Sequence, residues 1–166
     1  MVPDGGVIEG IVGVAEGSAL ADALAKRARI MALSQASYGA VLTPRDPGGL
    51  SHPERAALAL RMARLNADDT LAAHYADRLA ALDGSAALLW VADPAKVAGH
   101  GARLDAIIRH VDLLTREPRA ATRGDIEALK RAGVIEADIV RLAELAAFLN
   151  YQARVIAGFR LLKKVL

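Results

Sequence analysis

Residues 137–162, ADIVRLAELAAFLNYQARVIAGFRLL, decide the fold class of this sequence. Apolar positions recur every three or four residues along one side of this stretch, which is the period of an α-helix. These positions are Ile139, Leu142, Ala146, Leu149, Ala153 and Ile156. The opposite side is also apolar, at Val140, Phe148, Tyr151, Val155 and Phe159. A long helix with two apolar sides lies at the centre of a domain or against a neighbouring subunit, so the stretch predicts an all-α, oligomeric protein.

Capping residues mark further helices upstream of this stretch. Ser18 is expected to cap a helix that runs to about Tyr38. Ser51 and Glu54 have the spacing of a capping box, which begins a helix that ends near residue 66. Asp68 or Asp69 then caps a helix whose apolar side includes Leu71, Tyr75 and Leu79. The first half of the chain therefore reads as a series of helices.

The remaining segments carry weaker signals. The Asp93-Pro94 pair suggests a helix start, and an amphipathic helix is expected over 104–114. Thr122 and Asp125 resemble a cap for a short helix that ends at Gly133. The Gly-rich first ten residues are expected to be irregular.

Length and composition agree with a single helical domain. The chain has 166 residues, of which 54% are hydrophobic and only 4% aromatic. Such a length suffices for one domain with a sizeable core, and small aliphatic side chains suit closely packed helices. The absence of cysteine excludes disulfides, thiol catalysis and thiolate metal ligands.

Several functional classes receive no support from the composition. The longest uninterrupted apolar run, Ala86–Ala92, is far shorter than the ~20 residues of a membrane-spanning helix. The 21 basic residues are balanced by 19 acidic ones and show no basic run with interleaved aromatics, so no nucleic-acid partner is expected. The cluster of Arg160, Lys163 and Lys164 is expected to be a solvated helix end. Residues 1–9 lack a basic segment followed by an apolar run, so we expect a cytoplasmic protein.

The four histidines do not indicate a metal centre. His52, His74, His100 and His110 lack the spacing of paired metal ligands. No phosphate-binding loop, dinucleotide fingerprint or Gly-x-Ser-x-Gly motif is present. We therefore expect neither a metal nor a cofactor.

Two parts of the chain resemble a known superfamily. Residues 50–75, from LSHPER through RLN to LAAHY, look like the core of the carboxymuconolactone decarboxylase and alkylhydroperoxidase (AhpD-like) superfamily. Residues 125–158, with FLNYQAR at 148–154, resemble the C-terminal half of its peroxidase-related members. The resemblance implies one AhpD-like helical domain over 1–166. This domain would comprise an N-terminal extension and helix (1–46), a degenerate core motif (50–83) and a C-terminal signature (121–162).

The resemblance also implies a catalytic site that this chain does not retain. Peroxidase members carry a Cys-x-x-Cys pair, a histidine four residues after the second cysteine and a glutamate twelve residues before the first. On this chain the cysteine positions fall on Asp68 and Leu71, the histidine position on Tyr75 and the glutamate position on Ala56. Only thiols form the reversible disulfide that this turnover requires, so thiol peroxidase activity is rejected.

The leading hypothesis is a non-catalytic or regulatory member of this superfamily, associated with antioxidant defence. The resemblance implies a homodimer, homotrimer or homohexamer, and a cysteine-containing relative is a further expected partner.

The alternative is a cofactor-free lyase or isomerase that acts on a small carboxylated lactone or enol acid. Glu54 and His74 are its candidate acid and base, while Asn150 and Arg154 are its candidate substrate-binding residues. Each of these residues also has a structural interpretation, as a helix cap, an interior histidine or a polar link between helices. The sequence leaves both hypotheses open.

Overall fold

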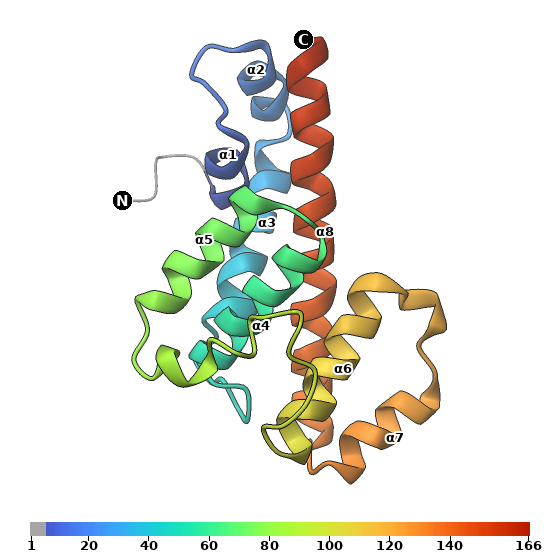
Figure 1. Ribbon diagram of the computed structural model, residues 1–166. Helices are drawn as coiled ribbons and strands as arrows, with labels where there is room; N and C mark the ends of the chain where they lie inside the picture. Colours follow the sequence, from blue (N-terminus) through green and yellow to red (C-terminus); the bar gives the residue numbers. More distant parts are fainter. Residues whose placement is uncertain (1–5) are drawn as a thin grey trace.

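A computed structural model describes residues 6–166, and its regular structure over this range is entirely helical (Figure 1). The α-helices are α1 (Val7–Val12), α2 (Ala19–Ala25), α3 (Ala28–Leu42), α4 (His52–Leu65), α5 (Asp69–Ala80), α6 (Ala102–Arg116), α7 (Arg123–Arg131) and α8 (Glu136–Val165). Two short 3₁₀ turns, η1 (Ser85–Leu88) and η2 (Pro118–Ala120), lie between them. No strand occurs within residues 6–166, which confirms the predicted all-α class.

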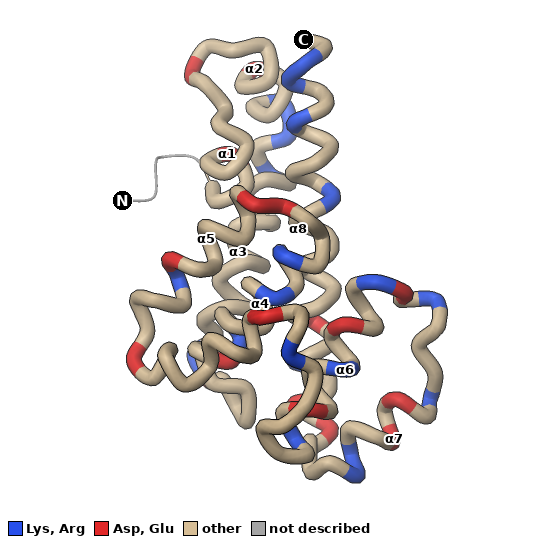
Figure 2. Tube along the Cα trace, viewed as in Figure 1, with Lys and Arg blue, Asp and Glu red and all other residues tan. Residues whose placement is uncertain are grey.

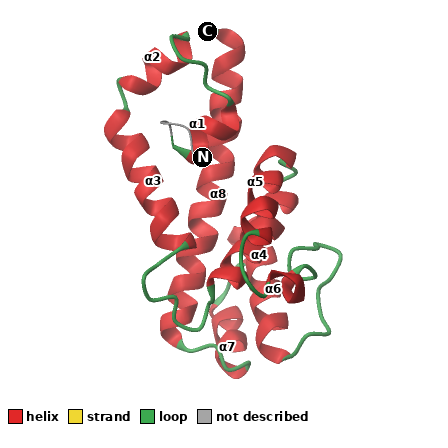
Figure 3. Ribbon diagram, turned by 90° about the vertical axis from the view of Figure 1, so that its left-hand side faces the viewer, coloured by secondary structure: helices red, strands yellow, loops and turns green. Residues whose placement is uncertain are grey.

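Helix α8 is the axis of the molecule. Its 30 residues run the full height of the ribbon, and α1, α2, α3, α4, α6 and α7 all pack against it (Figure 1). In Figure 3, α3 lies on one side of α8 while α4, α5 and α6 lie on the other. The predicted long helix over about 137–162 is therefore confirmed as the central element.

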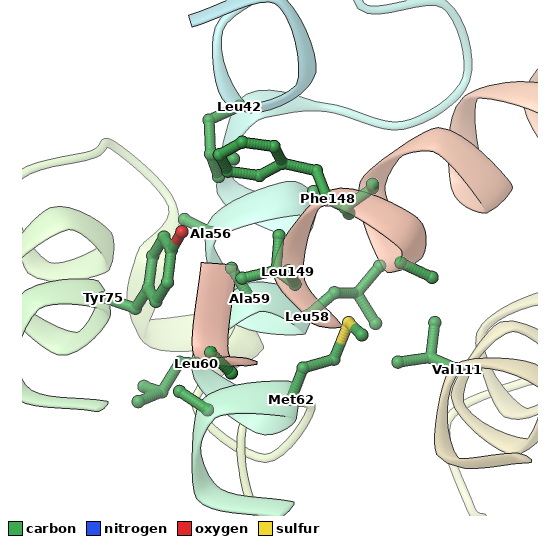
Figure 4. Packing of buried hydrophobic residues seen from close by; sticks show 14 of the residues in the cluster. Leu42, Ala56, Leu58, Ala59, Leu60, Met62, Tyr75, Val111, Phe148 and Leu149 are labelled. Atoms are coloured by element: carbon green, nitrogen blue, oxygen red, sulfur yellow. The ribbon is translucent and has the colours of Figure 1, made fainter. Parts of the chain in front are cut away.

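The core forms where α4 crosses α8. Leu58, Ala59 and Met62 from α4 converge with Phe148 and Leu149 from α8, and all five side chains are buried (Figure 4). Alanines on α4 keep its backbone near its neighbours, because a small side chain allows two helices to approach closely. This crossing holds the start of α5 near the C-terminal half of α8.

The helix starts predicted from capping residues are present. Ser51 Oγ accepts a hydrogen bond from the Glu54 N–H at 3.3 Å, and the Glu54 carboxylate accepts from the Ser51 N–H at 2.8 Å. Ser18 and Asp68 cap α2 and α5 through their side chains. The predicted cap at Thr122 and Asp125 also forms, with the Asp125 carboxylate accepting from the Thr122 N–H. Caps depend on residues three apart in the chain, so local sequence is sufficient to place them.

The N-terminal region differs from the prediction in two ways. The expected single helix over 18–38 is broken at Lys26 and Arg27, where Arg27 has non-helical dihedral angles of φ −120° and ψ 19°. The break lets α2 and α3 each bury their own apolar residues against α8. The first ten residues were expected to be irregular, but α1 begins at Val7, while residues 1–5 lie outside the described part of the chain.

The predicted helix start at Asp93-Pro94 is also wrong, because residues 89–101 form an irregular segment. Its backbone carbonyls at Val91, Asp93 and Lys96 instead accept hydrogen bonds from the guanidinium of Arg61. Arg61 is fully buried and also forms a two-point ion pair with Asp112 of α6, with both N···O distances at 2.6 Å. A buried arginine needs all of its donors satisfied, and here that requirement fixes the segment against α4 and α6.

A second buried arginine fixes the connection between α3 and α4. The Arg55 guanidinium donates to the carbonyl oxygens of Leu50, Val41 and Pro47 at 2.8–2.9 Å. Burial lowers the pKa of Arg55, with the positive charge of nearby Arg141 adding to the effect. The connection over residues 43–49 is therefore a loop held by specific hydrogen bonds.

No helix within residues 6–166 combines the length and the apolar character needed to cross a bilayer.

Candidate functional site

The start of α5 is the position where the resemblance places the two cysteines. Asp68 stands at the first of these positions and caps α5 by accepting from the Leu71 N–H at 3.0 Å. Its carboxylate also binds the guanidinium of Arg160 at two points, at 2.7 and 3.0 Å. Burial alone would raise the pKa of Asp68, but the hydrogen bonds from Arg160 and Leu71 outweigh it and lower the pKa. Asp68 is thus a charged helix cap, and both of its carboxylate oxygens accept hydrogen bonds.

The other residues at the degenerate positions are enclosed. Ala56, Leu71 and Tyr75 are each 0% exposed. The Tyr75 hydroxyl donates to Oε1 of Gln152 on α8 at 2.5 Å, while Gln152 Nε2 is buried without a partner among residues 6–166. Burial raises the pKa of Tyr75 well above its ordinary value, so the hydroxyl stays protonated. Side chains fill the space between α4, α5 and α8 at these positions.

His74 lies beside this region in an aromatic cluster. Its Nε2 is 2.8 Å from the hydroxyl of Tyr38 on α3, and its ring meets the Tyr75 ring edge-on, with centroids 5.0 Å apart. Burial lowers the pKa of His74, and the positive charge of Arg78 lowers it further. The pair joins α5 to α3 through a neutral imidazole.

Glu54 belongs to a different part of the molecule from His74. Besides its capping contacts with Ser51, it forms an ion pair with Arg103 of α6 at 2.7 Å. Arg103 also donates to the carbonyl of Gly49. These contacts give Glu54 the role of holding the start of α4 against α6, and none of them joins it to His74.

Asn150 and Arg154 lie one helical turn apart on α8 and have unequal surroundings. The Asn150 amide donates to the Leu114 carbonyl of α6 at 3.1 Å and accepts from Asn66 Nδ2 at 3.3 Å. Arg154 is exposed, and its Nη1 donates to the Asn150 carbonyl at 2.8 Å. Asn150 therefore links three helical segments, whereas Arg154 projects toward solvent.

A shallow groove brings some of the candidate residues together. It has a volume of about 300 Å³ and is lined by Asn66, Asp68, Arg154 and Arg160, with three alanines between them. His74 and Glu54 do not line it. The proposed substrate-binding arginine and the candidate acid and base thus face different surroundings.

Three of the residues that organise this region were not singled out from the sequence. Tyr38, Gln152 and Arg160 supply the partners of His74, Tyr75 and Asp68, respectively. Arg160 and Lys163 were expected to form a solvated helix end, but Arg160 binds Asp68, and Lys163 donates to the Gly13 carbonyl at the end of α1 at 2.6 Å. The one sequence signal that could have identified such a partner is an isolated polar residue on the apolar side of a helix, and Gln152 is such a residue.

No group of three or more His, Cys, Asp or Glu side chains within residues 6–166 is arranged to hold a metal ion.

Comparison with known proteins identifies a solved structure with a similar fold. The structure is similar to that of an uncharacterized peroxidase-related protein from Silicibacter sp. TM1040, with a TM-score of 0.67 and 20% sequence identity. The match covers 77% of this chain and 66% of that chain, which is slightly under two thirds of its length. No protein-family model matches the sequence, and no curated protein matches it. At this identity the likeness shows a shared fold.

Proposed function

We propose that the chain is a cysteine-free member of the carboxymuconolactone decarboxylase and AhpD-like superfamily, and that it acts as a non-catalytic or regulatory protein associated with antioxidant defence. The fold shared with a peroxidase-related protein supports the superfamily assignment. The absence of cysteine removes the thiol chemistry of the peroxidase members.

One observation carries the non-catalytic part of the proposal. The positions that correspond to the catalytic groups are occupied by a capping aspartate bound to Arg160 and by three fully buried side chains, Ala56, Leu71 and Tyr75. A reaction requires space for substrate beside its acid and base. Here that space is taken by packed side chains, and the one charged group is already neutralised by an ion pair.

The geometry supports the lyase alternative less well. A lyase of this kind needs an acid and a base that face a common cavity within hydrogen-bond reach of the substrate. His74 has a hydroxyl partner in Tyr38, but Arg154 lines a separate groove beside Asp68, and Glu54 is engaged with Ser51 and Arg103. No arrangement of these residues places a carboxylate clamp next to the acid and base.

Assembly and location are part of the same proposal. A homo-oligomer, with a cysteine-containing relative as a further partner, accounts for the apolar residues that α8 leaves exposed, such as Val140 and Tyr151. We also propose a cytoplasmic location.

Two assays on the purified protein test the proposal. Peroxide consumption in the presence of a dithiol reductant, and turnover of a carboxylated lactone, should both equal the rate in buffer. The variants Arg154→Leu and His74→Gln should leave both rates at that level, with Lys164→Leu as a matched surface control. Lactone turnover by the wild type that is lost in Arg154→Leu or His74→Gln but kept in Lys164→Leu would establish the lyase instead.

A further inference from the structure

One long surface of the molecule is apolar and lies between α3 and α8. We name it the α3–α8 face. On α3 it comprises Ile30, Leu33, Ser37 and Val41, and on α8 it comprises Val140, Glu144, Ala147, Tyr151, Val155, Gly158, Leu162 and Val165. The α8 residues recur every three or four positions, so they form one stripe along the outer side of the helix. A groove of about 500 Å³ separates the two helices where residues 30–41 of α3 face residues 144–151 of α8, and the rest of the α8 stripe continues beyond it.

The exposure of this face is unusual for large apolar side chains. Ile30 is 52% exposed, Leu33 58% and Tyr151 41%. Tyr151 is held in place by a 2.7 Å hydrogen bond between its hydroxyl and Ser34 Oγ, so its ring is fixed at the surface. The α3 segment 30–42 contains no charged residue at all. An ordinary solvent-facing helix carries charged residues outward, and this one does not.

The apolar area on this face is large enough for a stable contact between proteins. Its six exposed Ile, Leu, Val and Tyr side chains leave roughly 100 Å² each in water, about 600 Å² in total, compared with the ~800 Å² that one partner buries in a standard interface. It also reaches the upper end of the ~300–600 Å² of the largest apolar patch on a typical monomer. A partner that covers the whole face would therefore bury enough area for specific association.

The charges on the central part of α8 indicate which partner fits. Glu144 lies on the face and Arg154 at its edge, five residues before and after Leu149. Both are exposed, and neither forms an ion pair within residues 6–166. Ten residues span about 15 Å along a helix. Two antiparallel copies of α8 related by a two-fold axis at the level of Leu149 would place each Glu144 opposite the Arg154 of the other copy.

We propose that the α3–α8 face binds the same face of a second copy of this chain. The two-fold axis lies on the outer side of α8 at the level of Leu149 along the helix, so that two Glu144–Arg154 ion pairs flank a central contact of Ala147 and Tyr151. A two-fold interface uses one surface twice and must be complementary to itself, and this face meets that condition in both its apolar stripe and its two charges. The small side chains of Ala147 and Gly158 allow the helices to approach closely. The inference rests on the homo-oligomer proposed above and adds its surface and register.

A charge exchange tests the register. Sedimentation equilibrium would be measured for the wild type, Glu144→Arg, Arg154→Glu and the double variant carrying both changes. Each single variant sets like charges opposite each other at two places and should raise the dimer dissociation constant by about tenfold or more. The double variant restores opposite charges and should return the constant to near the wild-type value. Arg123→Glu, a change of an exposed charge on α7 that forms no ion pair within residues 6–166, is the matched control and should leave it unchanged.

The outcomes separate this inference from the proposed function. A wild-type oligomer that is unaffected by Glu144→Arg would overturn the face while leaving the oligomer itself intact. Weakening in both single variants without recovery in the double variant would overturn the Glu144–Arg154 pairing. A monomeric wild type would overturn both the interface and the homo-oligomer, and would assign the face to a different protein or to a membrane surface. The enzyme assays above report on catalysis independently of all three.

The absence of cysteine permits a second, covalent test. Ala147→Cys introduces the only thiol of the chain near the proposed two-fold axis, so mild oxidation should give a disulfide-linked dimer. Ala73→Cys places a thiol on an exposed alanine of α5, away from the face, and should stay monomeric on a denaturing gel. Equal cross-linking of the two variants would contradict the proposed interface, and this test does not depend on the charges.

Discussion

The inner and outer sides of α8 differ in their exposed residues and in the contacts of their polar side chains. On its inner side, polar residues meet specific partners: Asn150 binds the Leu114 carbonyl, Gln152 accepts from Tyr75, and Arg160 pairs with Asp68. On its outer side the residues are mainly apolar and remain exposed. The inner side also carries the buried apolar residues of the core, as any surface helix does, so the unusual feature is the apolar outer side.

This difference separates the contacts that hold the fold from the surface that we propose for association. The inner polar contacts each join α8 to a different element, so they fix how the helices cross. The outer side contributes little to the single chain, because water surrounds its larger side chains. Basic residues gather near the C-terminal end of α8 (Figure 2). Two of them, Arg160 and Lys163, bind groups within the chain, as the polar residues of the inner side do.

The largest expected effect on stability comes from a substitution on the inner side of α8. Leu149 is 1% exposed and lies in the core between α8 and α4, so Leu149→Ala should lower the free energy of unfolding by about 3 kcal/mol, from lost burial and the cavity that remains. Urea denaturation at a protein concentration low enough to keep the chain monomeric measures this change. The control is Leu33→Ala on the exposed side of α3, which should change the stability of the monomer by less than about 1 kcal/mol. Equal losses would contradict the division between the two sides.

An intermediate effect is expected at the first turn of α8. Asp138 is 4% exposed, and its carboxylate accepts from the Gly49 N–H at 2.9 Å. A Cβ at Gly49 would overlap this carboxylate, so Gly49→Ala should destabilise the fold by about 2 kcal/mol. Gly39, inside α3, has open space where a Cβ would stand, and Gly39→Ala should instead stabilise by about 0.5–1 kcal/mol. Thermal unfolding followed by circular dichroism compares the two alanines, and shifts of the same sign would count against the close Gly49–Asp138 contact.

The smallest effect concerns the aromatic cluster on the inner side. Burial, with the added charge of Arg78, lowers the pKa of His74 below its ordinary value of 6.5, so the unfolded chain binds this proton more tightly than the folded chain. The free energy of unfolding therefore falls as the pH drops through 6.5.

Replacing the imidazole should reduce that dependence on pH. His74→Gln removes one titrating group and should flatten the stability profile below pH 6.5 by at most about 1.4 kcal/mol per pH unit. Urea titrations at several pH values measure the slope. Some slope should persist in the variant, because burial also lowers the pKa of His110. An unchanged slope in His74→Gln would show that His74 is equally accessible to protons in both states.

Local sequence correctly predicted the helices that begin at capping residues. It failed where the backbone conformation depends on contacts between residues far apart in the chain. Ser51 and Glu54 are three residues apart, and the capping box they predict is present. The irregular segment after η1 depends instead on Arg61, whose ion pair with Asp112 spans 51 residues. The break at Arg27 has no glycine or proline to announce it, and it arises because α2 and α3 pack separately on α8.

The candidate site shows the same limit. The resemblance to the superfamily placed Asp68, Leu71 and Tyr75 at the degenerate positions, and the apolar pattern identified Asn150 as a polar residue in an apolar helix. Neither supplied their partners, because the Asp68–Arg160 contact spans 92 residues and the Tyr75–Gln152 contact spans 77. Only the packed structure brings such pairs together, and only it shows that Ala56, Leu71 and Tyr75 are closed to solvent.

The sequence by itself determined the all-α class, the two apolar sides of α8 and the absence of thiol chemistry, because helical periodicity, capping and residue identity are local properties of the chain. The tertiary structure decided which side of α8 is buried, which polar side chains pair and whether the degenerate positions leave room for a substrate. Those properties depend on segments dozens of residues apart that meet when α4 and α5 pack against α8. Pair formation across such separations is decided by the packing of the whole chain.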